Sequence, residues 1–485
     1  MKIEFLTEPE LEFGGGGQHI DIRFGMMQYK PLDYTSASAP KDIKLGIVGT
    51  SETVEGVQTW LESCRNGISA KPSKQPYLFP EFPGFGSESN LPTSLITDSR
   101  LNQTIHQREF DKLRNGNNVN EIIRNAVEIF ISQLQYLGEK TAIDVLICAV
   151  PDKLLDLMAG DNATEASSTA DNRANKAEDS KVDFHDLLKA KAMGLKKPTQ
   201  LILPATYNPT KRRRQQGRVS EVELQDDATR AWNIYTALYY KALGTPWRLL
   251  RDPRELTTCY IGISFYKTLD KSKLLTSTAQ IFNERGDGVI LRGGIAKLSK
   301  EDKQPYLPAS GASKLLRDAL AAYRREHQNL PARVVLHKTS RYISEEFEGF
   351  KEALEQHNIS SVDFISFDSK SSTRLFRYGK YPPLRGTLLN LDDRSQVLYT
   401  RGSVDFFSTY PGQYVPRPLR FRCEDVEQTP KSLAKEILAL TKMNWNNTQF
   451  DRREPITIRA ARQVGSILKY LGTSDQIEPH YRFYM

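Results

Sequence analysis

Short apolar runs alternate with helical patterns along the first half of the chain. Three runs are apolar enough for buried strands: KLGIVGT (44–50), DVLICAVP (144–151) and TQLILP (199–204). The segments between them place apolar residues three and four positions apart, as amphipathic helices do: TVEGVQTWLESC, NVNEIIRNAVEIFISQLQYL and DFHDLLKAKAMG. Strands that alternate with helices predict a parallel, Rossmann-like α/β sheet.

Two further segments flank this pattern. ATRAWNIYTALYYKALG (228–244) predicts a strong amphipathic helix that stops at Gly244 and Pro246. Near the N-terminus, HIDIRFGMM (19–27) alternates apolar and polar residues and predicts a strand.

The pattern changes near residue 250. Strand-like segments follow one another at 259–268 and across 276–294, where TSTAQIFNERGDGVILRGG holds two of them. A helix, ASKLLRDALAAYRREH, and another strand, RVVLHKTS (333–340), come next. Three strands, a helix and a strand are the order of a ribonuclease-H-like fold. The chain therefore divides into residues 1–250 and residues 251–485.

Three segments interrupt the regular patterns. Residues 159–181 are small, polar and aperiodic, and predict an insertion that buries no core. Residues 211–218, KRRRQQGR, carry five cations in eight positions and form either a solvated loop or a phosphate contact. The aromatic stretch YLFPEFPGFG (77–86) either packs on its own core or meets a partner.

Composition narrows the class of protein. No uncharged apolar run approaches the roughly 18 residues of a membrane span, and the acidic start lacks a signal core, so we expect a cytoplasmic protein. The four cysteines form no CxxC pair, which predicts buried thiols rather than metal ligands. A formal net charge of +8 hints at a polyanionic partner.

One set of side chains has the chemistry to bind a terminal phosphate. His185 and Lys189 lie four apart on a predicted helix, Gln200 opens the next strand, and Lys241 lies near the end of the 228–244 helix. Lysines supply positive charge, and the imidazole and amide supply directed donors. Spacing alone leaves open a solvated helix face for His185 and Lys189 and a snorkelling Lys241.

The order of these segments resembles that of short prokaryotic Argonautes, which consist of a MID domain and a PIWI domain. The resemblance covers nearly the whole chain. It is carried by PELEFGGGGQHIDIRFG, DFHDLLKAKAM with PTQLILP, ATRAWNIYTALYYKALGTPWRL, YIGISFYK with AQIFNERGDGVILRG, RVVLHKTS, LYTRGSVDFFSTYPGQYVPRPL and PITIRAARQVGSILKYL. It implies a Rossmann-like MID domain over 1–250 and a ribonuclease-H-like PIWI domain over 251–485.

The resemblance also implies a binding site for the 5′-phosphate of a guide. By it, His185, Lys189, Gln200 and Lys241 take the places of the family's phosphate-binding residues. Family members often add a divalent metal that the C-terminal carboxylate helps to hold, which makes Met485 a candidate ligand for Mg²⁺.

The cleavage centre of active relatives has no match in this sequence. Ser264 stands where the first metal-binding aspartate belongs, and Lys338 and Thr339 stand where a later strand ends in another. Arg459 and Arg462 occupy the region of the last ligand and would repel a metal, and the nearby Glu284 and Asp287 do not restore the site. We therefore expect no catalytic residues.

The resulting hypothesis is a guided sensor without its own cleavage activity. A short guide RNA would pair with complementary single-stranded DNA. Output would come from an APAZ-domain effector protein carrying a sirtuin-like or TIR NAD-consuming domain, or a nuclease, in defence against phages or plasmids. Two alternatives remain: a self-sufficient guided nuclease with a relocated metal site, and an unguided basic interaction protein.

Overall fold

The computed structural model describes residues 2–116, 118–140, 142–159, 182–208, 214–215, 218–219, 225–250, 254–282, 288–368, 372–412, 415–449, 452–472 and 474–485. The predicted insertion at 159–181 and the pair Glu284 and Asp287 lie outside these residues, apart from residue 159. Of the basic segment 211–218, the backbone is described only within a short antiparallel pair, β8 (Arg214–Gln215) and β9 (Arg218–Val219).

Four parallel strands form the first large sheet, in the order β5-β4-β6-β7. Their bounds are β4 (Asp42–Gly49), β5 (Ser94–Thr104), β6 (Val145–Ala149) and β7 (Thr199–Ile202). Alternate residues of β6 enter two different cores: Val145 and Ile147 face one layer of helices, and Leu146 and Cys148 face the other. Helices on both faces of a parallel sheet confirm the predicted α/β arrangement.

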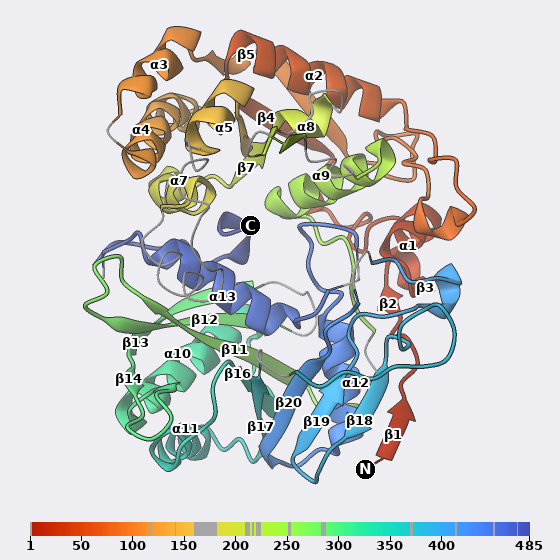
Figure 1. Ribbon diagram of the computed structural model, residues 1–485, viewed down its shortest axis with the longest axis vertical. Helices are drawn as coiled ribbons and strands as arrows, with labels where there is room; N and C mark the ends of the chain where they lie inside the picture. The colour runs from red at the N-terminus through yellow and green to blue at the C-terminus, as the bar shows by residue number, and fades with distance from the viewer. Residues whose placement is uncertain are drawn as a thin grey trace.

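Helices cover both faces of this sheet, as Figure 1 shows at the top of the molecule. One layer holds α2 (Ser51–Arg65) and α9 (Asp227–Lys241). The other holds α4 (Val119–Gly138), α5 (Asp152–Ala159) and α7 (Phe184–Ala192). The short helices α3 (Gln107–Lys112) and α8 (Pro204–Tyr207) lie at the ends of the sheet.

The second sheet has nine strands in the order β1-β18-β19-β20-β17-β16-β11-β12-β13. Their bounds are β1 (Lys2–Phe5), β11 (Thr258–Lys267), β12 (Leu274–Phe282), β13 (Gly288–Ile295), β16 (Arg333–Lys338), β17 (Ser361–Asp368), β18 (Thr387–Asn390), β19 (Ser395–Leu398) and β20 (Leu419–Val426). The β11–β12–β13 meander is antiparallel, whereas β16 runs parallel to β11 and β17 parallel to β16. This connectivity confirms the ribonuclease-H-like order.

Two helices cover each face of the nine-stranded sheet. On one side, α10 (Ala309–His327) and α11 (Ser344–Gln356) share a core with Ile261, Ile263 and Leu336. On the other side, α12 (Pro430–Leu440) and α13 (Ile456–Leu468) pack on Tyr260 and Val335. Smaller elements complete the fold: β14 (Lys297–Leu298) pairs with β15 (Pro305–Tyr306), and β2 (Leu11–Glu12) joins β3 (Gln18–His19) to β10 (Arg248–Leu249).

Two features of the N-terminal region differ from the sequence-based expectation. The segment predicted as a strand at 19–27 is mostly the helix α1 (Ile22–Tyr29), because Asp21 caps it by accepting hydrogen bonds from the backbone N–H groups of Arg23 and Phe24. The first strand, β1, pairs antiparallel with β18 and so belongs to the second sheet, although it lies within residues 1–250. The boundary near residue 250 stays a prediction.

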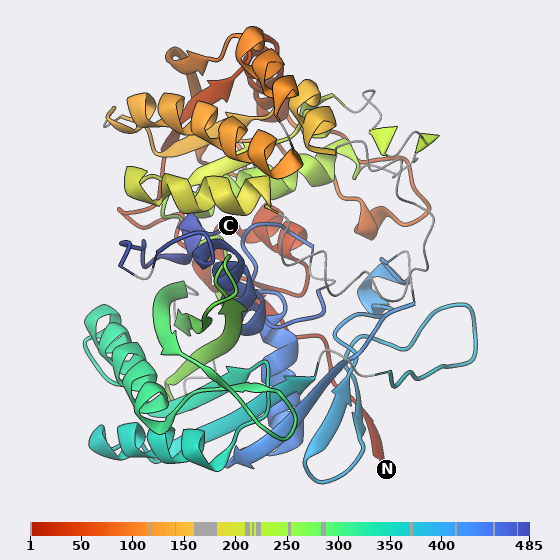
Figure 2. The same ribbon diagram turned by 60° about the vertical axis from the view of Figure 1, so that its left-hand side comes forward.

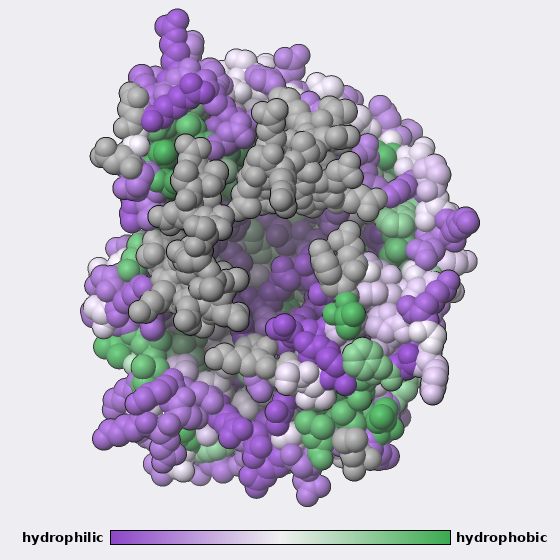
Figure 3. All heavy atoms as spheres, viewed as in Figure 1, coloured by the Kyte–Doolittle hydropathy of each residue, from purple (hydrophilic) through white to green (hydrophobic). Residues whose placement is uncertain are grey.

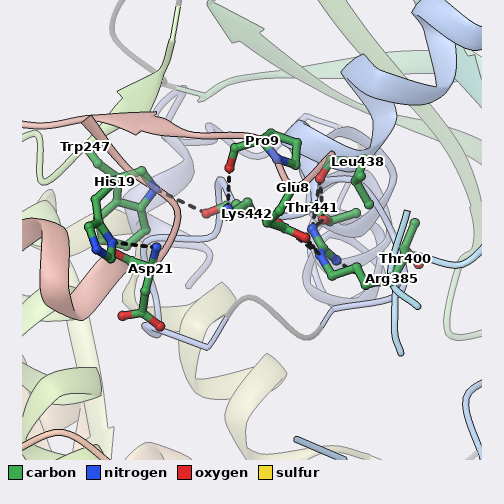
Figure 4. A network of polar contacts seen from close by, with 10 residues as sticks. All are labelled: Glu8, Pro9, His19, Asp21, Trp247, Arg385, Thr400, Leu438, Thr441 and Lys442. Carbon is green, nitrogen blue, oxygen red and sulfur yellow. Dashed lines mark hydrogen bonds and ion pairs between the residues drawn. The ribbon is translucent and has the colours of Figure 1, made fainter. Parts of the chain in front are cut away.

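A buried ion network holds the N-terminal segment against the second sheet (Figure 4). The Glu8 carboxylate lies 2.8 Å from Arg385 and 3.0 Å from Lys442. Burial opposes its ionisation, but the two cations hold the pKa of Glu8 below its ordinary value. The carbonyl of Lys442 also accepts a hydrogen bond of 3.2 Å from the indole of Trp247, which ties in the end of the first half.

Candidate guide-binding site

Three of the four predicted phosphate-binding residues meet at the start of β7. Lys189 lies in the last turn of α7 and donates a 2.5 Å hydrogen bond to the carbonyl of Thr199. Lys241, the last residue of α9, donates a 2.9 Å hydrogen bond to the side-chain oxygen of Gln200, the next residue of the same strand. Two ammonium groups and one amide thus come together, although Lys241 and Gln200 are 41 residues apart in sequence.

His185 lies one helical turn before Lys189, at the open end of the group. Its ring is about one-third exposed, and Nδ1 is 3.0 Å from Asp186. The side chain of Asp186 is also the acceptor of a 3.2 Å hydrogen bond from Gln463 of α13. Burial opposes the ionisation of Asp186, but its hydrogen bonds, the first of them to His185, hold its pKa below the usual value.

The two lysines are buried without a salt bridge among the described residues, although the charge of Asp186 acts on Lys189 and opposes part of the effect of burial. Each side chain is 1% exposed, and neither forms an ion pair with a carboxylate of the described chain. Burial lowers the pKa of Lys189 to about 7. Burial, followed by repulsion from Lys189, lowers the pKa of Lys241 well below its ordinary value. The solvated helix face and the snorkelling lysine that spacing left open do not describe these two side chains.

Such a pair of cations is costly unless an anion joins it. A buried charge that only neutral oxygens contact keeps much of its desolvation penalty. A phosphate dianion would compensate both ammonium groups and accept their hydrogen bonds. Figure 3, which has the same view as Figure 1, shows hydrophilic residues gathered in a hollow near the centre of the molecule, between the two sheets.

The C-terminus approaches the same region from the second sheet. Figure 1 places it between α7 and α9 on one side and α13 on the other. Met485 is 6% exposed and lines a small cavity with Tyr240, the neighbour of Lys241, and with Trp445. A carboxylate at this end of α9 is the kind of oxygen ligand that Mg²⁺ takes together with substrate phosphates. The chemistry of the donor therefore suits the predicted metal.

One group of side chains in the described chain could hold a metal without Met485. The ligand atoms of Asp183, His185 and Asp186 lie within 4.8 Å of one another at the start of α7. Sequence reasoning singled out His185 for phosphate and missed this grouping, although the spacing Asp-x-His-Asp is visible in the sequence. In the structure these atoms already serve the helix: Asp183 caps α7 by accepting a hydrogen bond of 2.9 Å from the Asp186 backbone.

Ser264 and Thr339, which stand where active relatives are expected to have aspartates, are neighbours: Ser264 lies in β11, and Thr339 directly follows the adjacent strand β16. The Thr339 N–H donates a 3.1 Å hydrogen bond to the carbonyl of Ile263, the residue before Ser264. Lys338 is different: its side chain leaves on the opposite face and forms a fully buried ion pair of 2.5 Å with Glu346. Lys338 is therefore part of the α11 packing, and Thr339 is the residue of this strand end that pairs with Ser264.

The two arginines predicted near the last metal ligand both lie on α13. Arg462 lies 3.5 Å from Glu454, on the exposed side of α13. Burial raises the pKa of Tyr481 to about 12, and the charge of Arg459 partly offsets this shift. The α13 residue that crosses β11 is Thr457, whose hydroxyl is 2.8 Å from Nδ1 of His337.

Two further features bear on the site predictions. A cavity of about 530 Å³ opens where β16 and β17 end, and Thr339, Arg341, Arg420 and Arg422 help to line it. In the aromatic stretch 77–86, Phe82 and Phe85 are buried against the first core, whereas Tyr77 is half-exposed. Phe82 and Phe85 therefore pack within the first half, whereas the ring of Tyr77 lies 5.0 Å from that of Phe406 in the second half.

The sequence matches the model of the Piwi domain family over residues 177–471. Among solved structures, the fold resembles Clostridium butyricum Argonaute bound to a guide DNA and a 19-mer target DNA, with 15% identity, a TM-score of 0.65, and coverage of 98% of this chain and 53% of that chain. Drosophila Piwi is similar at 14% identity and a TM-score of 0.62, over 99% and 56% of the two chains. A. aeolicus Argonaute is similar at 14% identity and a TM-score of 0.58, with coverage of 99% of this chain and 55% of that chain.

This chain thus spans about half the length of the structures that it resembles. No curated protein matches its sequence. Among the helices of the described residues, none has the length and apolar character needed to cross a bilayer.

Proposed function

The chain belongs to the Piwi domain family, and from that premise we propose that it holds a short guide RNA by its 5′-phosphate and uses it to recognise complementary single-stranded DNA. The observation that carries the proposal is the pair of buried lysines, Lys189 and Lys241, which contact the first two residues of β7 and lack a carboxylate partner in the described chain. A 5′-phosphate supplies the missing charge. Base pairing then reads the target sequence, while the protein holds backbone and shape.

Four further residues belong to the proposed site. His185 and Gln200 direct hydrogen bonds to the phosphate, and Met485 offers its terminal carboxylate to a Mg²⁺ ion beside it. Such an ion supplies positive charge to the guide phosphates when it is bound. Arg459 of α13 is a fourth candidate, because its charge acts on Tyr481 near the C-terminus.

We also propose that the chain does not cut its target. In-line cleavage needs carboxylates that hold two divalent ions about 4 Å apart. At the two matching positions, within β11 and directly after β16, the side chains are the hydroxyls of Ser264 and Thr339. Output then comes from an APAZ-domain effector protein with a sirtuin-like or TIR NADase or a nuclease, acting in cytoplasmic defence against phages or plasmids. The alternative is a self-sufficient guided nuclease whose metal site has moved.

The test of the guide site compares one variant with two kinds of guide. Lys241→Met removes the charge but keeps the volume, so guides with a 5′-phosphate should bind more weakly by about 1.5–3 kcal/mol, the usual worth of a charge-assisted hydrogen bond. Guides with a 5′-hydroxyl should bind almost as they do to the unaltered chain. Fluorescence anisotropy measures both affinities.

Lys431→Met is the matched control, because Lys431 is half-exposed and pairs with Glu4 at the far edge of the second sheet. It should leave both affinities unchanged. Equal losses for the two guide types with Lys241→Met would mean that this lysine does not contact the phosphate, and the proposed site would be wrong.

A further inference from the structure

The loop between β17 and β18 carries aromatic and basic side chains in alternation. Residues 372–383 read STRLFRYGKYPP, with three cations and no carboxylate. Phe376 is 83% exposed, and Tyr378 is fully exposed. Figure 2 shows the loop extending away from the body of the nine-stranded sheet. Exposed rings of this size are unfavourable in water, and a cluster of them in a soluble protein usually marks a binding surface.

Hydrogen bonds fix both ends of the loop, so its tip projects into solvent and does not fold back onto the sheet. The Leu375 N–H donates a 2.6 Å hydrogen bond to the hydroxyl of Tyr399. At the other end, the Ser403 hydroxyl donates a 2.9 Å hydrogen bond to the carbonyl of Pro382. Within the tip, Nε of Arg377 donates to the carbonyl of Tyr381 over 3.2 Å. The chain thus holds Phe376 and Tyr378 outward.

A cluster of arginines lies at the base of the loop. Thr400, the neighbour of Tyr399, donates a 2.7 Å hydrogen bond to the carbonyl of Arg453. Burial lowers the pKa of Arg453; Glu454 opposes the shift, and the charges of Arg417, Arg462 and Arg374 add to it. The charges of Arg417, Arg462 and Arg374 thus all act on Arg453, and Arg462 lies 3.5 Å from Glu454. Their excess positive charge is complementary to a polyanion.

Helix α13 connects this cluster to the guide-binding site. Gln463 of α13 contacts Asp186 beside His185, and Arg453 precedes Gln463 by ten residues. Helix α13 begins at Ile456, so seven of these ten residues rise by 1.5 Å each and the first three are non-helical, which puts the two ends on the order of 10–20 Å apart. Stacked bases rise about 3.4 Å each, so a strand that starts at the phosphate site reaches Arg453 after about three to six nucleotides.

We infer that the loop at residues 372–383 is a stacking platform for the bases of the strand that the guide-binding site holds. Phe376 and Tyr378 stack on bases, and Arg377 and Lys380 contact the phosphates between them, beyond about the fifth nucleotide. Aromatic rings interleaved with cations on a positively charged surface are the chemistry of single-strand binding, because every base has a face to stack and every link a charge to meet. The inference rests on the proposed function, since the same strand occupies both places.

The experiment measures strand-length dependence with the full chain and 5′-phosphorylated single-stranded RNAs of about 4 and 16 nucleotides. The unaltered chain should bind the longer RNA more tightly. The double variant Phe376→Ala/Tyr378→Ala should lose about tenfold or more in affinity for the longer RNA, because each stacked base contributes substantially. Its affinity for the shorter RNA should not change, because that RNA ends before the platform.

Two controls separate stacking from other effects. Phe376→Tyr/Tyr378→Phe keeps both rings and should retain full binding. Tyr136→Ala removes an exposed aromatic residue of α4 that is far from the loop in sequence, and it should also retain full binding. Arg377→Ala/Lys380→Ala should reduce the salt dependence of binding, whereas the aromatic variant should leave that dependence unchanged.

Each outcome has a distinct meaning. If the aromatic variant binds both RNAs as the unaltered chain does, the platform does not exist. If it keeps full RNA binding but loses a co-purifying protein, the loop is a protein-docking surface and the inference is wrong. If the affinity for neither RNA depends on its 5′-phosphate, the proposed function itself is wrong. The affinity that the aromatic variant loses for the longer RNA tests the platform separately.

Discussion

Lys189 and Lys241 show how one environment changes the chemistry of a common residue. Both ammonium groups contact oxygens of adjacent β7 residues, and burial is the main cause of both lowered pKa values. In a solvated position each lysine would stay charged far above neutral pH. Here the charged forms need an anion, so ligand binding and protonation are coupled.

This coupling predicts a pH dependence with opposite signs for binding and for stability. The pKa of Lys189 is about 7 in the folded chain and near its ordinary value in the unfolded chain. As pH rises above 7, the folded chain must take up a proton to bind a phosphate, so affinity for 5′-phosphorylated guides should fall, by at most about tenfold per pH unit for this group.

Stability of the unliganded chain should rise over the same interval. Between pH 7 and about 10 the unfolded chain keeps the Lys189 proton that the folded chain has lost, and stability increases wherever the unfolded state binds more protons. Guide titrations and thermal unfolding from pH 6.5 to 9 measure the two trends. Lys189→Met should reduce both trends, and the part that remains comes from Lys241, whose pKa burial also lowers. A guide affinity that does not change with pH would contradict the assignment.

Residue identities pointed to this site, but they could not describe its environment. The spacing of His185 and Lys189 on one helix, with Gln200 at the next strand, was enough to group them. The burial of the Lys241 side chain depends on α9 and on the segment around Asn446, whose side-chain oxygen lies 3.5 Å from the Lys241 ammonium group. That contact joins positions 205 residues apart. Local sequence carries no such information, nor could it show that Lys338 turns away toward Glu346.

At the scale of elements, α13 crosses β11 so closely that only a glycine fits at the crossing. A Cβ atom at Gly262 would lie 2.1 Å from the carbonyl oxygen of Thr457. Backbone on both sides leaves no flexible side chain to move aside. The same contact sets the height of α13, and with it the positions of Gln463 and of the arginines before the helix.

We therefore predict that Gly262→Ala destabilises the chain at the upper end of the roughly 1–3 kcal/mol that overpacking costs, or beyond it. Denaturant unfolding measures the loss. Gly294→Ala is the matched control, since Gly294 also lies in a strand of this sheet and a Cβ there meets nothing within 4 Å. Similar stabilities of the two variants would show that α13 shifts without cost.

Long periodic elements followed from the sequence, whereas a short one did not. The apolar spacing of 118–137 and 228–244 predicted α4 and α9 to within a few residues. For 19–27, the alternation also fits a helix, because Ile22 and Met26 lie four apart and both are buried. The helix cap formed by Asp21 distinguishes helix from strand here, and the alternation of apolar and polar residues does not reveal it.

At the scale of the whole molecule, several contacts join the two sheets around the guide-binding site. The Glu8 network fastens the N-terminal segment beneath the second sheet, and β1 adds to that sheet's edge. On the other side, Asp186 of α7 contacts Gln463 of α13, and the hydroxyl of Tyr470 accepts a 2.8 Å hydrogen bond from the Asp183 N–H. A strand held at α7 therefore lies against both halves of the chain.

This arrangement leads to a prediction about catalysis. The guide-loaded chain should hold a matched target without cutting it, in Mg²⁺ and in Mn²⁺. Ser264 and Thr339 lie on neighbouring strands, so Ser264→Asp/Thr339→Asp would create two adjacent carboxylates. The double variant should still fail, because a two-metal centre needs further ligands, and the α13 residue that crosses β11 is Thr457, whose hydroxyl is engaged with His337.

A labelled target incubated with guide-loaded chain, without and with a co-purified partner, provides the measurement. Activity that requires the partner, and that persists in Ser264→Ala, would agree with a sensor that binds through pairing and transmits the signal. A single cut by the chain alone, at a fixed distance from the 5′ end of the guide, would contradict it. In that case metal ligands outside the two strand ends perform the cleavage, and the self-sufficient nuclease is the correct description.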